Sequence, residues 1–158
     1  MMQNKPLSQH PANQDKLHLY GNSAAVTFEA TMKSDLHTVN VDIAPKPDQY
    51  NVDWSQKTTI QLSSTELVMV TGVFLGYAPE IHCGRPNKGI KFIRQPGKVY
   101  ISASSQDKGM VGVPLTLGDC ARAGEFFLYQ LAKGSFSGDV GMVLASLKGA
   151  LALNRLQN

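Results

Sequence analysis

The sequence predicts an α+β domain in which a set of antiparallel strands followed by one helix occurs twice, with a further helix at the C-terminal end. Runs of alternating apolar and polar residues, typical of half-buried strands, occur in both halves of the chain. Each set ends in the same junction: a leucine, then a serine or threonine, and an acidic residue three positions after that serine or threonine. The junction occurs at Leu62–Glu66 and again at Leu115–Asp119, 53 positions further on.

In the first half, period-two alternation predicts strands over Ala24–Thr31, His37–Ile43 and Thr58–Leu62. Ser63 and Glu66 have the spacing of a capping box, in which the serine oxygen and the glutamate satisfy free N–H groups at the start of a helix. The apolar helix that follows ends at Gly76.

The second half has the same order of elements. Strands are expected over Ile90–Arg94, Val99–Ser104 and a segment through Val113. A helix follows Thr116, carries Asp119 at its third position and ends near Gly134. The repeats therefore extend over about 17–77 and 80–134, and the last helix over 138–156. We expect residues 17–158 to form one binding domain behind a flexible polar arm, residues 1–16.

Positive charge is concentrated in the second half. The whole chain carries a formal charge of +3, whereas Glu80–Lys108 contains six cations and two acids and is therefore +4 by itself. The cations are Arg85, Lys88, Lys91, Arg94, Lys98 and Lys108. Local basicity of this kind favours a surface that binds a polyanion. A solvated sheet face beside a lysine-rich hairpin is the alternative.

The turn at Pro96-Gly97 determines which side chains share a face of the predicted hairpin. If Gln95 pairs with Lys98, Ile93 lies opposite Tyr100 and Lys91 opposite Ser102. This face then combines cations, a ring and hydroxyl groups. Such side chains bind phosphates, stack on unpaired bases and bond to base edges, so the pattern favours single-stranded nucleic acid as the ligand.

Five short segments resemble, in order, motifs of the Whirly single-stranded DNA-binding family. Tyr20–Thr27 resembles the motif Y-K-G-K-A-A-L-x-V, although neither motif lysine has a counterpart. The other segments are Tyr50–Lys57, Leu62–Leu67, Gly97–Ser102 and Val113–Thr116. The resemblance covers about Tyr20–Lys133. It implies two four-stranded antiparallel sheets, each followed by a helix, and helices that join subunits, commonly as tetramers. It also implies DNA bound across sheet edges with little sequence preference.

Together, the charge, the hairpin face and the resemblance predict a protein that binds single-stranded DNA with little sequence specificity. An RNA-binding or transcription-modulating module and a protein-interaction scaffold are the alternatives. The residues expected to contact nucleic acid are Lys57, Lys88, Lys91, Ile93, Arg94, Lys98, Tyr100, Ser102, Lys108, Tyr50 and Trp54. The strand parity of Trp54 also allows it to lie in the core or to anchor its loop.

The last helix has a leucine stripe, Leu144, Leu147 and Leu151, and a stripe of small residues, Gly141, Ala145 and Gly149. Small residues four positions apart allow a second helix to approach closely. The helix therefore either covers the core of its own subunit or forms a subunit interface. We expect a homo-oligomer, with a tetramer ahead of a dimer.

No nucleotide-binding loop, nucleophile motif, paired carboxylates or metal-ligand spacing is present in the sequence, so we expect neither an enzyme, a metal site nor a cofactor. Cys83 and Cys120 lack disulfide spacing and are expected to be small apolar side chains in a reduced setting. The apolar stretch Phe136–Leu153 contains Asp139 and Lys148, which argues against a membrane span. A cytoplasmic location, with the nucleoid if the source is bacterial, is expected.

Overall fold

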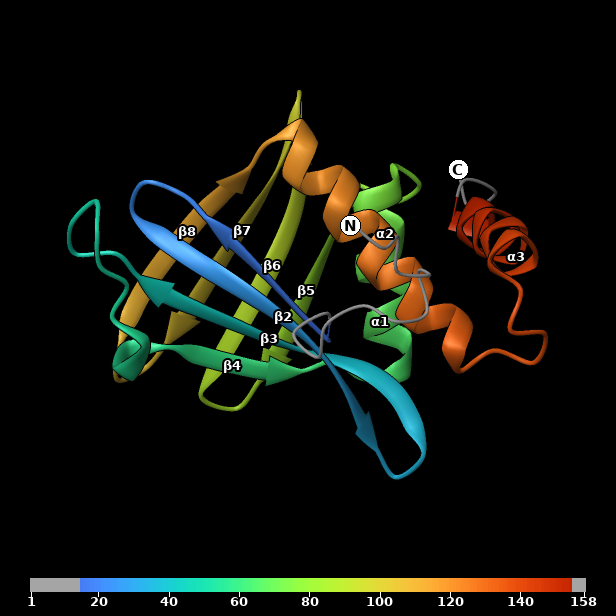
Figure 1. Ribbon diagram of the computed structural model, residues 1–158, viewed down its shortest axis with the longest axis horizontal. Coiled ribbons are helices and arrows are strands. Elements are labelled where there is room, and N and C mark those ends of the chain that lie inside the picture. Colours follow the sequence, from blue (N-terminus) through green and yellow to red (C-terminus); the bar gives the residue numbers. More distant parts are fainter. Residues whose placement is uncertain (1–14, 155–158) are drawn as a thin grey trace, which may run out of the picture.

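The computed structural model describes residues 15–154 and contains two consecutive ββββα units followed by a helix (Figure 1). Each unit has one antiparallel sheet with its strands in chain order, sheet A in the first and sheet B in the second. The predicted fold class is confirmed. The first unit consists of β1 (Lys16–Tyr20), β2 (Ala24–Lys33), β3 (Leu36–Pro45), the 3-10 helix η3 (Trp54–Gln56), β4 (Thr58–Gln61) and α1 (Ser64–Leu75). The second consists of β5 (Glu80–Arg85), β6 (Lys88–Gln95), β7 (Lys98–Ser105), β8 (Gly109–Leu115) and α2 (Leu117–Lys133), and α3 (Val140–Ala152) follows.

Strands β1 and β5 are the two elements that alternation alone did not locate. The first contains only two inward-facing apolar residues, Leu17 and Leu19. The second, Glu80–Arg85, carries polar residues and a glycine, and its single buried side chain is that of Cys83. Both are edge strands; β5 lacks an apolar pattern, whereas β1 alternates over its five residues. The family resemblance supplied the fourth strand of each sheet.

The helices begin at the two predicted junctions. The hydroxyl oxygen of Ser63 accepts a hydrogen bond from the Glu66 N–H at 3.2 Å, and the Glu66 carboxylate accepts one from the Ser63 N–H at 2.9 Å. This capping box is the predicted one. Helix α2 follows Thr116, but the Thr116 side chain makes no capping hydrogen bond. Asp119 lies in the first turn of α2, where its negative charge interacts favourably with the positive end of the helix dipole.

A cluster of four phenylalanines joins both sheets to the helices. Phe127 of α2 lies 4.9 Å from Phe28 of β2 and 5.4 Å from Phe74 of α1, between ring centroids. Phe74 in turn lies 6.0 Å from Phe92 of β6. Each ring comes from a different element, so the core lies where the inner faces of the sheets meet α1 and α2. Burial of such rings contributes strongly to stability and keeps the sheets in a fixed relative position.

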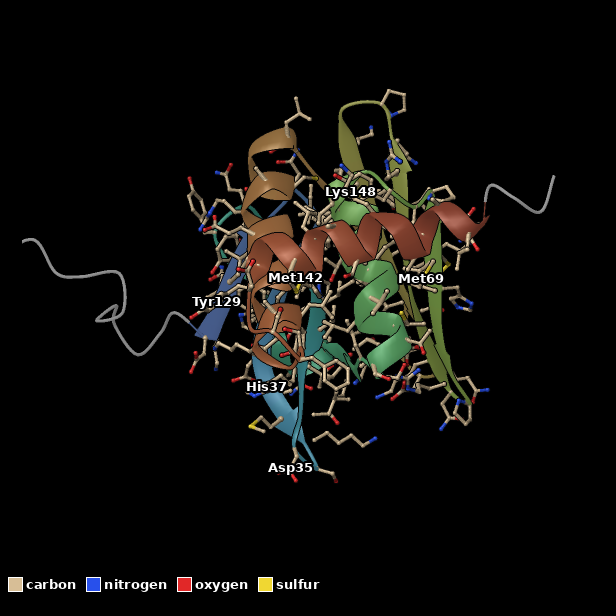
Figure 2. The ribbon with its side chains drawn as sticks, turned by 90° about the vertical axis from the view of Figure 1, so that its right-hand side faces the viewer. Asp35, His37, Met69, Tyr129, Met142 and Lys148 are labelled. Carbon is tan, nitrogen blue, oxygen red and sulfur yellow. The ribbon has the colours of Figure 1, made fainter. Side chains whose placement is uncertain are left out.

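The helices pack at the right-hand side of the sheets, where the β2–β3 hairpin also extends (Figure 1). The β5–β6 and β7–β8 turns and η3 gather at the lower left of Figure 1, while α3 lies at the far right. Figure 2 shows α3 crossing in front of α1 and α2, which it contacts. Within residues 15–154, no helix combines the length and the apolar character that a membrane crossing requires.

The described elements differ from the expected segment boundaries near both ends of the chain. The predicted arm, residues 1–16, lies outside the described residues apart from its last two, and Lys16 already belongs to β1. The last helix is shorter than the expected 138–156. It begins at Val140, because the Asp139 carboxylate caps it by accepting a hydrogen bond from the Met142 N–H at 3.0 Å.

Candidate nucleic-acid interface

The β6–β7 hairpin has the register that the Pro96-Gly97 turn predicted. Gln95 is paired with Lys98, Ile93 with Tyr100, and Lys91 with Ser102. The opposite face of the hairpin packs on the core, as expected. Its buried apolar residues are Ile90, Phe92, Val99, Ile101 and Ala103. The outer face of sheet B therefore carries the predicted cations, ring and hydroxyl together, with the cations exposed and Ile93, Tyr100 and Ser102 half-buried.

The ring of Tyr100 reaches across β8 and covers Gly112. A Cβ atom placed on Gly112 would lie 2.6 Å from Tyr100 Cζ and 3.3 Å from Cε2, too close for any other residue without moving the ring. Ser102, not Tyr100, is the direct partner of Gly112 in the ladder, so the ring lies diagonally over the neighbouring strand. The glycine thus provides the space in which the aromatic ring of Tyr100 rests on the outer face.

A second set of predicted residues lines a groove at the sheet edges. Trp54, Lys57, Lys88 and Lys108 line an open groove of about 580 Å³ between β4 and the β5–β6 and β7–β8 turns, hereafter the edge groove. The Lys108 ammonium donates a hydrogen bond to the Lys57 carbonyl at 2.9 Å and so ties the β7–β8 turn to β4. Residues that are up to 54 positions apart in the sequence thereby form one basic surface.

Trp54 lies neither in the core nor on a strand. It belongs to η3, before β4 begins at Thr58, so the parity argument that allowed a core position does not apply. The Asp53 carboxylate caps this short turn through the Ser55 N–H at 3.2 Å. The indole is half-buried, meets His18 edge-on at 6.4 Å between centroids, and lines the edge groove.

Two arginines of the basic segment are engaged within the protein. Arg94 has the inward parity of Ile90 and Phe92, and its guanidinium donates to the Gly76 carbonyl at the end of α1, at 2.9 Å. The structure thus places Arg94 on the face opposite Tyr100. Arg85 donates to both carboxylate oxygens of Glu66, at 2.8 and 2.9 Å. Lysines therefore supply the positive charge of the outer face and the edge groove, where Lys57 also lies 3.8 Å from the Asp42 carboxylate.

The Glu66–Arg85 pair joins three elements. Besides Glu66 of α1, Arg85 of β5 donates to the Gln61 carbonyl at the end of β4, at 2.7 Å. Hydrogen bonding to the Arg85 guanidinium lowers the pKa of Glu66 to about 2. The carboxylate therefore remains charged at any pH near neutrality, and the pair connects the edge of sheet A to the first helix and to sheet B.

Tyr50 lies apart from the edge groove. Its side chain is 82% exposed in the segment between β3 and η3, and it is not among the residues that line the groove. The backbone of this segment is held by the Asp48 carboxylate, which accepts hydrogen bonds from the Tyr50 and Asn51 N–H groups at 2.8 and 3.0 Å. The structure therefore does not bring Tyr50 together with the groove residues.

Sheet A has an outward-facing pair of rings that the sequence analysis did not select. His18 and Tyr20 alternate with the buried Leu17 and Leu19 on β1, and their rings stack with 6.5 Å between centroids. His18 also shares a hydrogen bond of 2.8 Å with the Thr27 hydroxyl. The alternation of Leu17 and Leu19 with polar residues was the available signal, because strict alternation over four to eight residues is typical of a half-buried strand.

Helix α3 presents its two predicted stripes to different surroundings. Leu147 and Leu151 are buried in the core of the same chain, and Leu151 fills the space over Gly72 of α1. Leu144 is half-buried, while Gly141, Ala145 and Gly149 are exposed. A Cβ atom on Gly149 would meet nothing within 4 Å. The leucine stripe is therefore mainly an intramolecular contact, whereas the small-residue stripe is exposed to solvent.

The cysteines have little thiolate character. Cys83 is fully buried, and desolvation raises its pKa to about 12. Cys120 is half-buried and donates its thiol to the Leu115 carbonyl at 3.3 Å, and burial raises its pKa as well. Both side chains thus fit the prediction of small, packed residues.

No protein-family model matches the sequence, and no curated protein matches it either. Solved structures do match. WHY1 from Arabidopsis thaliana is 20% identical over 87% of this chain and 92% of its own, with a TM-score of 0.61. The plant transcriptional regulator PBF-2 is 21% identical over 73% of this chain and 79% of its own, with a TM-score of 0.58.

A guide-RNA-binding protein complex bound to a gRNA is also similar in structure. It is 11% identical over 82% of this chain and 97% of its own, with a TM-score of 0.61. At these identities the similarity concerns the fold. The paired ββββα units and the similarity to WHY1 and PBF-2, both Whirly proteins, together show that this chain has a Whirly-like fold.

Proposed function

We propose that this protein binds single-stranded nucleic acid, DNA before RNA, with little sequence preference over the strand as a whole. The observation that carries the proposal is the edge groove, in which Trp54 lies beside Lys57, Lys88 and Lys108. Lysines neutralise phosphates regardless of sequence, and an indole can stack on any base. The outer face of sheet B, with Lys91, Lys98 and Tyr100, extends the same chemistry.

A flexible single strand fits this surface better than a duplex does. The cations and rings are distributed over two sheet edges and one sheet face, a path that a flexible single strand can follow. Stacking on Tyr100 or Trp54 requires bases whose faces are exposed, and duplex bases are stacked on each other. DNA is placed first because of the resemblance to the Whirly family.

RNA is the second candidate ligand. The similarity to a guide-RNA-binding complex favours it, and backbone and stacking contacts do not themselves separate the two nucleic acids. A transcription-modulating role is compatible with either ligand, as the similarity to the plant transcriptional regulator suggests. A protein-interaction scaffold is the remaining alternative, and binding to oligonucleotides distinguishes it from the other two.

The expected result of an equilibrium binding experiment is tighter binding to a single strand than to a duplex of the same length. Tyr100→Ala should weaken single-strand binding by about 1–3 kcal/mol, the range for one base–ring stack, while Tyr100→Phe should retain most of the affinity because the ring remains. Fluorescence anisotropy with matched single-stranded DNA, RNA and duplex, repeated over a range of salt, measures all of these. Equal affinity for duplex and single strand would contradict the proposal, and no binding to either would favour the scaffold.

We propose further that the chain forms a homo-oligomer through α3, with a tetramer ahead of a dimer. The exposed stripe of Gly141, Ala145 and Gly149 allows close approach of a second helix, and Met142 beside it is 61% exposed. Gly149→Leu should lower the molar mass measured by light scattering at tens of micromolar, because the new side chain occupies the space of the partner. Lys148→Leu, at the neighbouring position, is the control for added apolar volume. A monomeric wild-type protein would refute the proposal.

A further inference from the structure

The outer face of sheet A carries a row of three rings that leads from β1 to the edge groove. His18 and Tyr20 are both exposed, and their ring planes are inclined by only 20°, with 6.5 Å between centroids. Trp54, which lines the edge groove, meets His18 at 6.4 Å between centroids, with an angle of 69° between the planes. The aromatic surface of the groove therefore continues beyond the indole onto β1.

The alternation of β1 directs both rings away from the core. Leu17 and Leu19 are buried on the inner face. His18 and Tyr20 alternate with them and therefore share the outer face, two positions apart. The Thr27 hydroxyl of the neighbouring strand lies 2.8 Å from His18 Nδ1 and orients the imidazole. The Tyr20 side chain remains 58% exposed, so its ring is accessible to a ligand.

The turn between β1 and β2 brings this row of rings to sheet B. A Cβ atom on Gly21 would lie 2.7 Å from Val113 Cγ2, so a glycine is needed for the turn to pack this closely on β8. The residue before Val113 is Gly112, over which the Tyr100 ring lies. Because Tyr20 immediately precedes the turn, the row of rings begins beside sheet B and ends in the edge groove.

The charged side chains of the outer face of sheet A are paired with each other. Lys16 lies 3.4 Å from Glu29, and Lys57 lies 3.8 Å from Asp42. Their charges therefore cancel pairwise, in contrast to the excess of lysines on the outer face of sheet B. A neutral aromatic surface suits the uncharged faces of bases, while the phosphates of the same strand are attracted to the lysines of sheet B.

We propose that Tyr20 and His18 stack unpaired bases of the bound strand, which continues from Trp54 in the edge groove across the outer face of sheet A. Tyrosine and histidine rings both serve as platforms for unpaired bases. Every base has a π-face, so this surface extends the binding site without selecting a base. The inference rests on the proposed single-strand binding and adds a second sheet to the surface that binds the strand.

The test measures the affinity of the full-length protein for a thymine strand of about 16 nucleotides by competition anisotropy. Tyr20→Leu is expected to weaken binding about fivefold, the lower end of the range for one base–ring stack, because the ring is lost while an apolar side chain remains. Tyr20→Phe should bind like the wild type. His18→Ala should weaken binding by a similar factor, and His18→Phe should not. The slope of log affinity against log salt should be unchanged in both Tyr20 variants, since neither loses a charge.

Tyr129→Leu is the matched control. Tyr129 is also 58% exposed, but it belongs to α2, whose Phe127 packs on Phe28 at the inner face of sheet A (Figure 2). Its replacement should leave the affinity unchanged. Unchanged affinity in Tyr20→Leu, or equal losses in Tyr20→Leu and Tyr129→Leu, overturns the inference while leaving single-strand binding intact. A wild-type protein that does not bind the thymine strand instead overturns the proposed function.

Discussion

Replacing Lys57, Lys88 and Lys108 together by glutamine is expected to reduce single-strand affinity by roughly 100-fold at low salt. Opposite unit charges at 4 Å in water attract by about 1 kcal/mol, so the loss of three such contacts corresponds to this factor. The slope of log affinity against log salt should become shallower by about 0.7 for each lysine that contacts a phosphate. Salt titrations of the wild-type and variant proteins on one oligonucleotide measure both quantities.

Lys33→Gln provides the control for each single lysine variant. Lys33 is exposed near the tip of the β2–β3 hairpin, which extends to the lower right of Figure 1, whereas the β5–β6 and β7–β8 turns lie at the lower left. Its removal changes the net charge equally but should leave the salt slope unchanged. An equal effect of Lys33→Gln and Lys88→Gln would mean that only the overall charge matters and that the edge groove is not the binding surface.

Glu66→Gln is expected to destabilise the protein by about 2 kcal/mol at neutral pH. Glutamine keeps the capping box with Ser63 but removes the charge that pairs with Arg85. The magnitude follows from hydrogen bonds to charged groups at a site partly screened by solvent. Asp119→Asn, at the same position of the second repeat, should cost far less, because no hydrogen bond partner of Asp119 is present among the described residues. Urea denaturation at one protein concentration measures the difference.

The same pair makes the stability depend on pH in a defined direction. The pKa of Glu66 is lowered in the folded protein to about 2, from about 4.3 in an unfolded chain. Its stabilising effect is therefore complete above pH 4.3 and is lost as the pH falls towards 2. The stability difference between wild type and Glu66→Gln should shrink over this window. A difference that is the same at pH 7 and at pH 2.5 would contradict the assignment of the effect to this ion pair.

Local patterns were sufficient for most of the fold. Alternation located three strands in each repeat, and the serine or threonine with an acid three positions later marked the starts of α1 and α2. These signals are local because strand faces and helix caps depend on neighbours within a few residues. The pairing of Ile93 with Tyr100 followed from a turn of two residues, for the same reason.

The candidate site was only partly accessible from the sequence. The hairpin register identified Lys91, Tyr100 and Ser102 as neighbours, but the surroundings of Arg94 depended on a helix end about 18 positions away. From its residue type alone, an arginine that binds a ligand cannot be distinguished from one that donates a hydrogen bond to the carbonyl groups at a helix end. Arg85 is a second example, since its carboxylate partner lies in α1.

The sequence by itself determined the repeated sheet-and-helix units, the core faces and the register of the central hairpin, because each depends on contacts between residues close in the chain. Only the tertiary structure decided that Trp54, Lys57, Lys88 and Lys108 share one groove, and that Arg85 and Arg94 serve the fold instead. Both outcomes depend on how two sheets pack on a shared phenylalanine core. That packing depends on contacts between side chains that are distant in the sequence, so no local pattern predicts it.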